Sequence, residues 1–315
     1  CRGKQGGAPS SCHTILVIAP AMRSATLAPD KIAPLRDAVA NSSRVADDMA
    51  MIRAAAELTR DLNAPNPLIY WADFLGFTIL GYAALFMALN ALQPLSVAGW
   101  AILAIIGLYR AGLFIHELTH IKHSAVPGFR LAWNVLIGVP LMVPSFMYEG
   151  IHNLHHARTR YGTVEDPEYL PLALMKPWTV PLFVLVAALG PVALLVRFAV
   201  LTPLSVVIPP LRTLVVERFS GLIINPVFRR RPPEGAARRD WLVLEAACSL
   251  WAITLLASVA GGFIPLRDFL LFLGVLSGVV VLNQIRTLVA HLWENDGDVM
   301  SVTAQFLDSV NVPPP

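Results

Sequence analysis

Charge is scarce in this sequence. Only 14% of its 315 residues are Asp, Glu, Lys or Arg, whereas ordinary soluble domains carry about 25%. Hydrophobic side chains make up 56% of the chain, which is more apolar surface than a soluble domain of this length can bury. The same proportions exclude disordered, collagen-like and small disulfide-rich proteins. The composition therefore predicts an integral membrane protein.

Cysteine pairs, basic runs and nucleotide-binding motifs are also missing. The three cysteines, Cys1, Cys12 and Cys248, show neither metal-ligand spacing nor an evident partner, which is typical of a reducing compartment. The net charge is only +3 and no basic run carries interleaved aromatic side chains, so we expect no nucleic-acid partner. Neither a C-x-x-C pair nor a strand followed by G-x-G-x-x-G occurs, so no fused redox module is predicted.

Long apolar runs are what the sequence has in abundance. A helix needs about 20 apolar residues to cross a bilayer, and helices are required because lipid offers no partner to backbone polar groups. The first two runs are separated by a very short turn and predict a helical hairpin, whereas the third contains Pro140 and Pro144 and predicts a kinked or interfacial element. The predicted fold class is all-α, a multi-pass transmembrane helical bundle. The runs are residues 68–92, 95–115, 131–148, 178–196 with a short return leg over 198–211, 241–265 and 269–285.

The two ends of the chain differ from this apolar part. Residues 1–65 predict an N-terminal cytoplasmic segment, and residues 66–315 predict the membrane domain. Apolar residues recur among Arg and Asp over residues 32–62, which predicts an amphipathic helix lying on the membrane surface or forming a solvated cap. Residues 1–21 show no periodicity, and we expect them not to be native.

Loop charge sets the expected orientation. Residues 212–240 hold seven Arg against two Glu and one Asp, the strongest positive bias in the chain. The positive-inside rule places this loop in the cytoplasm. Counting spans outward from it places residues 116–130, 149–177 and those after 286 on the same side of the membrane.

Histidine is concentrated in one part of the chain. Six of the eight histidines lie between residues 116 and 156, where even spreading would place about one. The first cluster is His116, His120 and His123, and the second is His152, His155 and His156. Their spacings keep each cluster on one helical face, and each cluster extends a membrane helix or hairpin. Imidazoles that converge without cysteine suit a first-row metal such as iron or zinc, and their number favours two metal ions.

The first cluster permits a second interpretation. Residues 116–120 read His-Glu-Leu-Thr-His and match the H-E-x-x-H pattern of zinc proteases, some of which are embedded in membranes. Such a protease needs only one more ligand, so the second cluster disfavours this interpretation. A non-enzymatic metal transporter or chaperone is a third alternative. A transporter would need ionisable residues along several spans, whereas Asp73, Arg110 and Glu245 lie mostly near the ends of their runs.

Together the clusters resemble the histidine boxes of the membrane fatty acid desaturase and hydroxylase family. That family carries H-x(3–4)-H, H-x(2–3)-H-H and H-x-x-H-H on cytoplasmic extensions of transmembrane helices. His116 and His120 match the first box, the second cluster matches the second box, and His291 resembles an additional ligand of the family. The resemblance covers residues 68–315. No third box follows His291, and we expect the chain to be truncated before it.

The resemblance implies a site with two iron ions that uses O2 as co-substrate. It also implies a lipid acyl substrate and an external electron donor such as a ferredoxin, rubredoxin or cytochrome. Glu117, Glu149 and Glu294 are candidates for orienting the imidazoles, and Gln284 and Thr287 lie on the same helical face as His291. The implied metal ligands are His116, His120, His152, His155, His156 and His291, while His123 is a ligand, a supporting residue or a solvated histidine.

Desaturation, hydroxylation and ketolation share these boxes. We expect desaturation of an acyl lipid or acyl thioester, because it is the most frequent reaction in the family, with a hydroxylase or ketolase and the zinc protease as alternatives. Since the third box is missing, we also expect this chain to hold two irons poorly and to be inactive as written. Arg286, at the end of the last run, either pairs with a polar headgroup or extends to the membrane interface.

Overall fold

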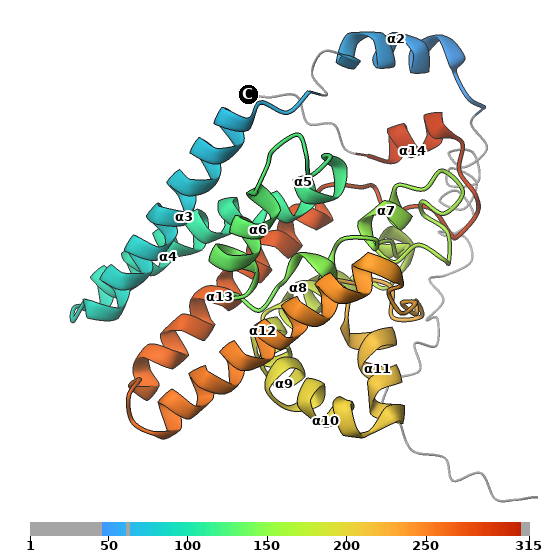
Figure 1. Ribbon diagram of the computed structural model, residues 1–315. Coiled ribbons are helices and arrows are strands. Elements are labelled where there is room, and N and C mark those ends of the chain that lie inside the picture. Colours follow the sequence, from blue (N-terminus) through green and yellow to red (C-terminus); the bar gives the residue numbers. More distant parts are fainter. Residues whose placement is uncertain (1–45, 61–63, 310–315) are drawn as a thin grey trace, which may run out of the picture.

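The computed structural model describes residues 46–60 and 64–309, and within these ranges it is built from helices (Figure 1). Isolated bridges join Thr163 to Gly297 and His291 to Ser309, and no strand is formed in the described ranges. The predicted all-α fold class is confirmed. Five helices in this part of the chain are long and apolar enough to cross a membrane. They are Pro67–Asn90, Pro94–His120, Gly190–Val207, Gly235–Ala260 and Leu266–Leu288.

The predicted hairpin consists of α3 (Pro67–Asn90) and α4 (Pro94–Gly112). Each helix begins with a proline, which has no N–H to leave unpaired at the first turn. The two backbones pack closely at Gly81 and Gly107, where a Cβ on Gly107 would lie 2.7 Å from the Gly81 Cα. Small residues are the usual means of bringing membrane helices this close.

The middle of the chain differs from the expected spans. A span was predicted over residues 178–196, but α8 (Thr179–Ala187) ends before Gly190 and Pro191. The proline opens a new helix, α9 (Gly190–Val196), because it cannot donate the hydrogen bond that would continue the previous one. The new helix continues through the π-helix η5 (Arg197–Leu201) and α10 (Thr202–Val207), followed by α11 (Pro209–Phe219).

The predicted kinked element is short and irregular. It comprises α6 (Phe129–Trp133), the π-helix η2 (Asn134–Gly138), a turn and the 3-10 helix η3 (Ser145–Met147). The Asn134 side chain closes the turn, because it accepts from the Ser145 N–H at 2.9 Å and donates to the Ser145 Oγ at 3.0 Å. The element leads directly into α7 (His152–His155).

The last two spans, α12 (Gly235–Ala260) and α13 (Leu266–Leu288), form a second hairpin. Arg197 is buried in the middle of the bundle, where its guanidinium lies 2.7 Å from the Glu245 carboxylate of α12. Arg212 binds the other oxygen of the same carboxylate at 2.7 Å. This ion-paired group links η5 and α11 to α12.

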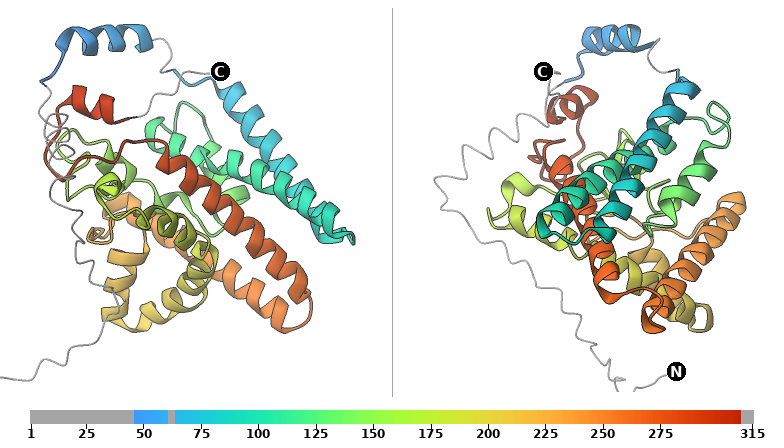
Figure 2. Two further views of the ribbon diagram at one scale, coloured as in Figure 1. Left: turned by 180° about the vertical axis from the view of Figure 1, so that it is seen from behind. Right: turned by 90° about the vertical axis from the view of Figure 1, so that its left-hand side faces the viewer.

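The N-terminal helix is shorter in the described residues than the sequence predicted. The helix α2 (Met49–Thr59) is capped by the Asp48 side chain and has no buried residue. The predicted range of residues 32–62 extends beyond the described residues at both ends. The turns of the two hairpins lie at one end of the molecule, and α2 and α14 (Val302–Asp308) lie at the other (Figures 1 and 2).

Candidate metal centre

The first histidine box lies on α5 (Phe114–His120), which continues α4 after Leu113. His116 and His120 are one helical turn apart, and their ring centroids lie 4.6 Å from each other. The helix α5 packs through Phe114 against a cluster of aromatic rings, in which the ring centroids of Phe114 and Phe129 lie 5.2 Å apart. The box is therefore supported by the packed end of the membrane bundle.

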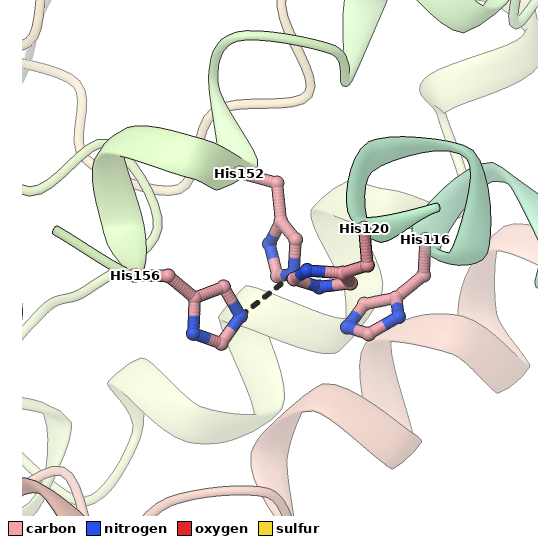
Figure 3. Close-up of side chains that lie close together, drawn as sticks. All are labelled: His116, His120, His152 and His156. Carbon is pink, nitrogen blue, oxygen red and sulfur yellow. Dashed lines mark hydrogen bonds between the residues drawn. The ribbon is translucent and has the colours of Figure 1, made fainter. Parts of the chain in front are cut away.

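The second box lies on α7, which contacts α5. His152 and His156 face His116 and His120 across the gap between the two helices (Figure 3). One ligand nitrogen from each of these four histidines lies within 4.8 Å of the other three. We call this group the four-histidine cluster.

Carboxylates fix the tautomer of His152. Its Nδ1 lies 3.0 Å from the Glu168 carboxylate and 2.8 Å from the Tyr148 hydroxyl, which donates to Glu168. Because a carboxylate accepts, Nδ1 carries the proton and Nε2 keeps its lone pair. That Nε2 lies 2.9 Å from the Nε2 of His156. Two ring nitrogens this close are stable when a proton or a metal ion lies between them.

Burial favours neutral imidazoles in this region. Burial, aided by the neighbouring imidazoles, lowers the pKa of His152, and it lowers the pKa of His156 to about 4. Burial also lowers the pKa of His291 to about 3. These rings are neutral at pH 7 and present lone pairs, which is the form that binds metal.

His155 and His291 form a second group, with ring centroids 5.3 Å apart. The His155 Nδ1 lies 2.9 Å from Asp166, which is fully buried. Burial by itself lowers the pKa of His155, but the hydrogen bond and charge of Asp166 outweigh it and the pKa is raised. As at His152, the carboxylate holds the proton on Nδ1 and leaves Nε2 free.

His291 follows α13 and is held by a tyrosine in place of a direct carboxylate. Its Nδ1 lies 2.7 Å from the Tyr161 hydroxyl, which donates to Asp308 at 2.8 Å. Tyr169 donates to the other oxygen of Asp308 at 3.0 Å. The short helix α14 therefore supports the second group, because Asp308 is its last residue.

The other predicted site residues have different partners. His123 lies outside the four-histidine cluster, with its Nε2 3.8 Å from Glu149, and Glu149 binds Arg130 through both oxygens at 2.6 and 2.8 Å. Glu117 accepts from Tyr70 at 2.7 Å and lies 3.5 Å from the His116 Nδ1. The remaining candidates contact no box histidine in the described residues: Thr287 donates to the Asn283 carbonyl, and Gln284 and Glu294 make no side-chain hydrogen bond there.

Sequence reasoning missed the residues that orient the imidazoles. Asp166 and Glu168 follow the second box by about ten residues. Tyr161 and Asp308, which meet beside His291, are 147 residues apart in the sequence. A search for carboxylates was possible, because metal-binding histidines usually donate to one. Spacing alone could not select these two, because they reach the histidines through a loop and not along a helix.

The donor set fits two metal positions better than one. Four imidazoles converge at one position, and the rings of His155 and His291 lie together beside it. Imidazole ligands without thiolate suit iron or zinc. Metal-binding histidines usually donate their second ring N–H to a carboxylate, and the buried carboxylates beside these rings are in that position.

Comparison with known proteins identifies the family of this chain. A family profile described as "Fatty acid desaturase" matches residues 92–313, which is more than half of the chain. The chain belongs to the fatty acid desaturase family. It is also 46% identical over 273 residues to a ceramide hydroxylase of Caulobacter vibrioides (strain NA1000 / CB15N), covering 87% of this chain and 78% of the relative. No solved structure matches the chain.

This family membership bears out the expected resemblance and supports a membrane oxidoreductase of lipid metabolism. The apolar helices agree, because they are those of a multi-pass membrane protein. The histidine boxes of this desaturase-family chain lie together at the end of its spans.

A cavity of about 1000 Å³ lies behind the box helices. Leu118 and Thr119 of α5, and Asn153 and Leu154 of α7, line it with the faces turned away from the metal positions. Five arginines and three acidic residues complete its charged lining, so its net charge is positive. The arginines are Arg130, Arg160, Arg229, Arg230 and Arg231, and the acidic residues are Glu149, Glu165 and Asp240.

Proposed function

We propose that this chain is an O2-dependent diiron oxidase that hydroxylates a methylene of a ceramide-like lipid. The observation that carries the proposal is the four-histidine cluster with His155 and His291 beside it, in a desaturase-family chain. The sequence alone favoured desaturation. The ceramide hydroxylase relative, at 46% identity, favours hydroxylation of a lipid instead.

The histidines have two separate tasks in this proposal. The four-histidine cluster holds one iron, and His155 and His291 hold part of the second. Two bound irons supply the reduction of O2 and the removal of hydrogen from an unactivated C–H bond, which no side chain performs.

The supporting residues set the tautomer of the neutral ligand histidines. Asp166 and Glu168 accept the Nδ1 protons of His155 and His152, so the Nε2 lone pairs face the metal positions. Tyr161 fixes the ring of His291 in the same way. Because these partners are buried, water does not compete for the same hydrogen bonds.

Electrons must come from outside the chain, and we infer that they enter through the arginine-lined cavity. One turn of α7 separates that cavity from the histidines, since Leu154 lines the cavity and His155 faces the metal. An acidic donor protein complements its positive charge. Arg230 is held in place by bonds to the Ser220 and Glu149 carbonyls, and it stacks on Trp241 at 4.3 Å.

The boxes face the cytoplasm in this proposal. The arginine-rich loop of residues 212–240 supplies part of the lining of the same cavity. The side that the positive-inside rule assigns to the cytoplasm is therefore also the side on which we infer that electrons enter. A cytoplasmic donor protein would then reach the cavity directly.

The zinc protease is the weaker candidate. A protease with H-E-x-x-H uses the glutamate on a metal-bound water. Here the Glu117 carboxylate accepts from Tyr70, and His152 and His156 complete a cluster of four imidazoles, one more protein ligand than such a protease uses. The oxidase uses all four of these histidines, whereas the protease uses three and leaves one without a role.

The test is product analysis with labelled oxygen. The protein is purified in its full natural length, loaded with iron and supplied with a reduced ferredoxin. It is incubated with ceramide under ¹⁸O2, and the lipids are analysed by mass spectrometry. The proposal predicts a ceramide with one added ¹⁸O atom, and no such product from His120→Ala. A product that has lost two hydrogens without gaining oxygen would show desaturation, and zinc-dependent peptide cleavage without lipid oxidation would show the protease.

A further inference from the structure

A small cavity of about 260 Å³ adjoins the four-histidine cluster at His116. It lies between the first turn of α3, the junction of α4 with α5, and the last turn of α13. His116 is one of its walls, together with Glu117, Arg110 and Arg286. His116 therefore belongs both to this cavity and to the metal site.

Most polar groups of this cavity are already held in place. Tyr70 donates to Glu117, and Glu117 in turn lies 3.5 Å from the Nδ1 of His116. Arg110 pairs with Asp73. These contacts preorganise one wall that carries both an acceptor carboxylate and a cation.

Arg286 is different, because its guanidinium has no hydrogen bond or ion pair to any residue of the described ranges. A guanidinium offers five N–H donors. An exposed arginine at the end of a membrane helix ordinarily extends to water or lipid phosphate. This one lines a cavity that ends on a metal-site histidine, so its donors are available to a molecule bound there.

The cavity lies at the depth where lipid headgroups are found. Tyr70 is in the first turn of α3 and Arg286 is in the last turn of α13, and both helices are membrane spans by length and composition. The ends of spans lie near the interface between lipid tails and headgroups. A lipid in the surrounding leaflet therefore has its polar head at the level of this cavity.

We propose that this cavity binds the polar head of the lipid substrate through Arg286, so that the carbon that is oxidised lies close to that head. This inference rests on the proposed function and adds the position of attack. The ring of His116 is 4.5 Å from that of His152 and 4.6 Å from that of His120. A head that touches His116 therefore leaves only the first carbons of its chain within reach of the metal position.

The size and chemistry of the cavity restrict the head. Its volume equals that of about nine water molecules, which suits an amide with one or two hydroxyl groups. Arg286 donates to a carbonyl or hydroxyl oxygen, and the Glu117 carboxylate has lone pairs left to accept from an N–H or O–H. An N-acylated amino alcohol matches both sides, because it carries a carbonyl, an N–H and hydroxyl groups close together.

The position of the new oxygen tests the proposal directly. Ceramide hydroxylated by the full chain under ¹⁸O2 is fragmented in a mass spectrometer, and the labelled carbon is located. We expect the label within the first few carbons from the amide, on either chain. A label in the middle or at the far end of a chain would overturn this inference and leave the proposed function standing.

Binding provides a readout that needs no turnover. Retention of ceramide by the metal-free protein is measured by native mass spectrometry for the wild type, Arg286→Gln, Arg286→Lys and the control Arg239→Gln. Arg239 is exposed and lies on α12, away from the cavity. We expect Arg286→Gln to weaken binding about tenfold or more, as for one hydrogen bond to a charged group, with partial recovery in Arg286→Lys and no change in the control.

The kinetic consequence separates positioning from folding. Arg286→Gln should raise KM more than it lowers kcat, and it should spread the label to carbons further along the chain. A variant that binds ceramide as the wild type does, and places the label on the same carbon, would overturn the inference. If no lipid is oxidised at all, the proposed function fails, and the binding measurement still decides whether Arg286 holds the head.

Discussion

Replacing Asp166 by asparagine should disturb one metal position and leave the other intact. Each carboxylate oxygen of this buried residue has two contacts: Oδ1 with the His155 Nδ1 and the Glu168 N–H, and Oδ2 with the His155 Nδ1 and the Gly162 N–H. An asparagine amide must replace one of these oxygens with an NH2 group. One buried backbone N–H then faces a donor, whichever way the amide is turned.

The magnitude follows from these contacts. A buried N–H without a partner costs about 1–3 kcal/mol, and a lost hydrogen bond to a charged group costs about 1.5–3 kcal/mol. Asp166→Asn should therefore destabilise the fold by roughly 2.5–6 kcal/mol. Iron affinity at the position of His155 and His291 should fall about 10–100-fold, the usual effect of removing a carboxylate that orients a ligand.

Iron titration and thermal unfolding in detergent measure both effects. Asp240→Asn is the matched control, because its carboxylate is 55% exposed and forms a surface pair with Arg130 at 3.2 Å. That change should cost no more than about 1 kcal/mol. If Asp166→Asn binds iron and unfolds like the control, the argument that buried carboxylates set the imidazole tautomers is refuted.

Three further changes test other parts of the structure. Glu245→Gln leaves Arg197 buried beside a neutral side chain and should destabilise the fold by about 3–5 kcal/mol. Replacing both residues by Met and Leu should recover most of the loss. Equal unfolding temperatures for the single and double variants would contradict this. Gly107→Ala places a Cβ against the α3 backbone and should cost about 1–3 kcal/mol, while Gly99→Ala, which has open space, should cost little; thermal unfolding of the pair decides. Reduction of the iron-loaded protein by an acidic ferredoxin should slow as salt is raised, and Arg231→Gln should slow it at low salt; stopped-flow rates that are independent of salt would exclude electrostatic docking.

The membrane part of the fold could be predicted from the sequence because its signal is simple. Apolar runs near 20 residues long correspond to α3, α4, α12 and α13, and the short turn before Pro94 predicted the first hairpin. The region around Pro191 could not be predicted in the same way. Hydropathy does not register that a proline divides one apolar run into two helices with different directions.

Part of the candidate site could likewise be predicted from the sequence, and part of it could not. Helical spacing predicted that the histidines of each box share one face, because i, i+3 and i+4 positions do so on any helix. The partners of those histidines come from loops and from α14, at sequence separations of up to 147 residues for Tyr161 and Asp308. No periodicity links such residues, so only the folded chain brings them together.

The most direct test of the account is iron X-ray absorption of the iron-loaded protein, compared with His120→Ala. The account predicts nitrogen ligands with the outer scattering of imidazole, and a loss of imidazole scattering in the variant, because His120 belongs to the four-histidine cluster. Iron bound mainly through oxygen or sulfur, or a spectrum that His120→Ala leaves unchanged, would contradict the claim that the histidine boxes form the iron site.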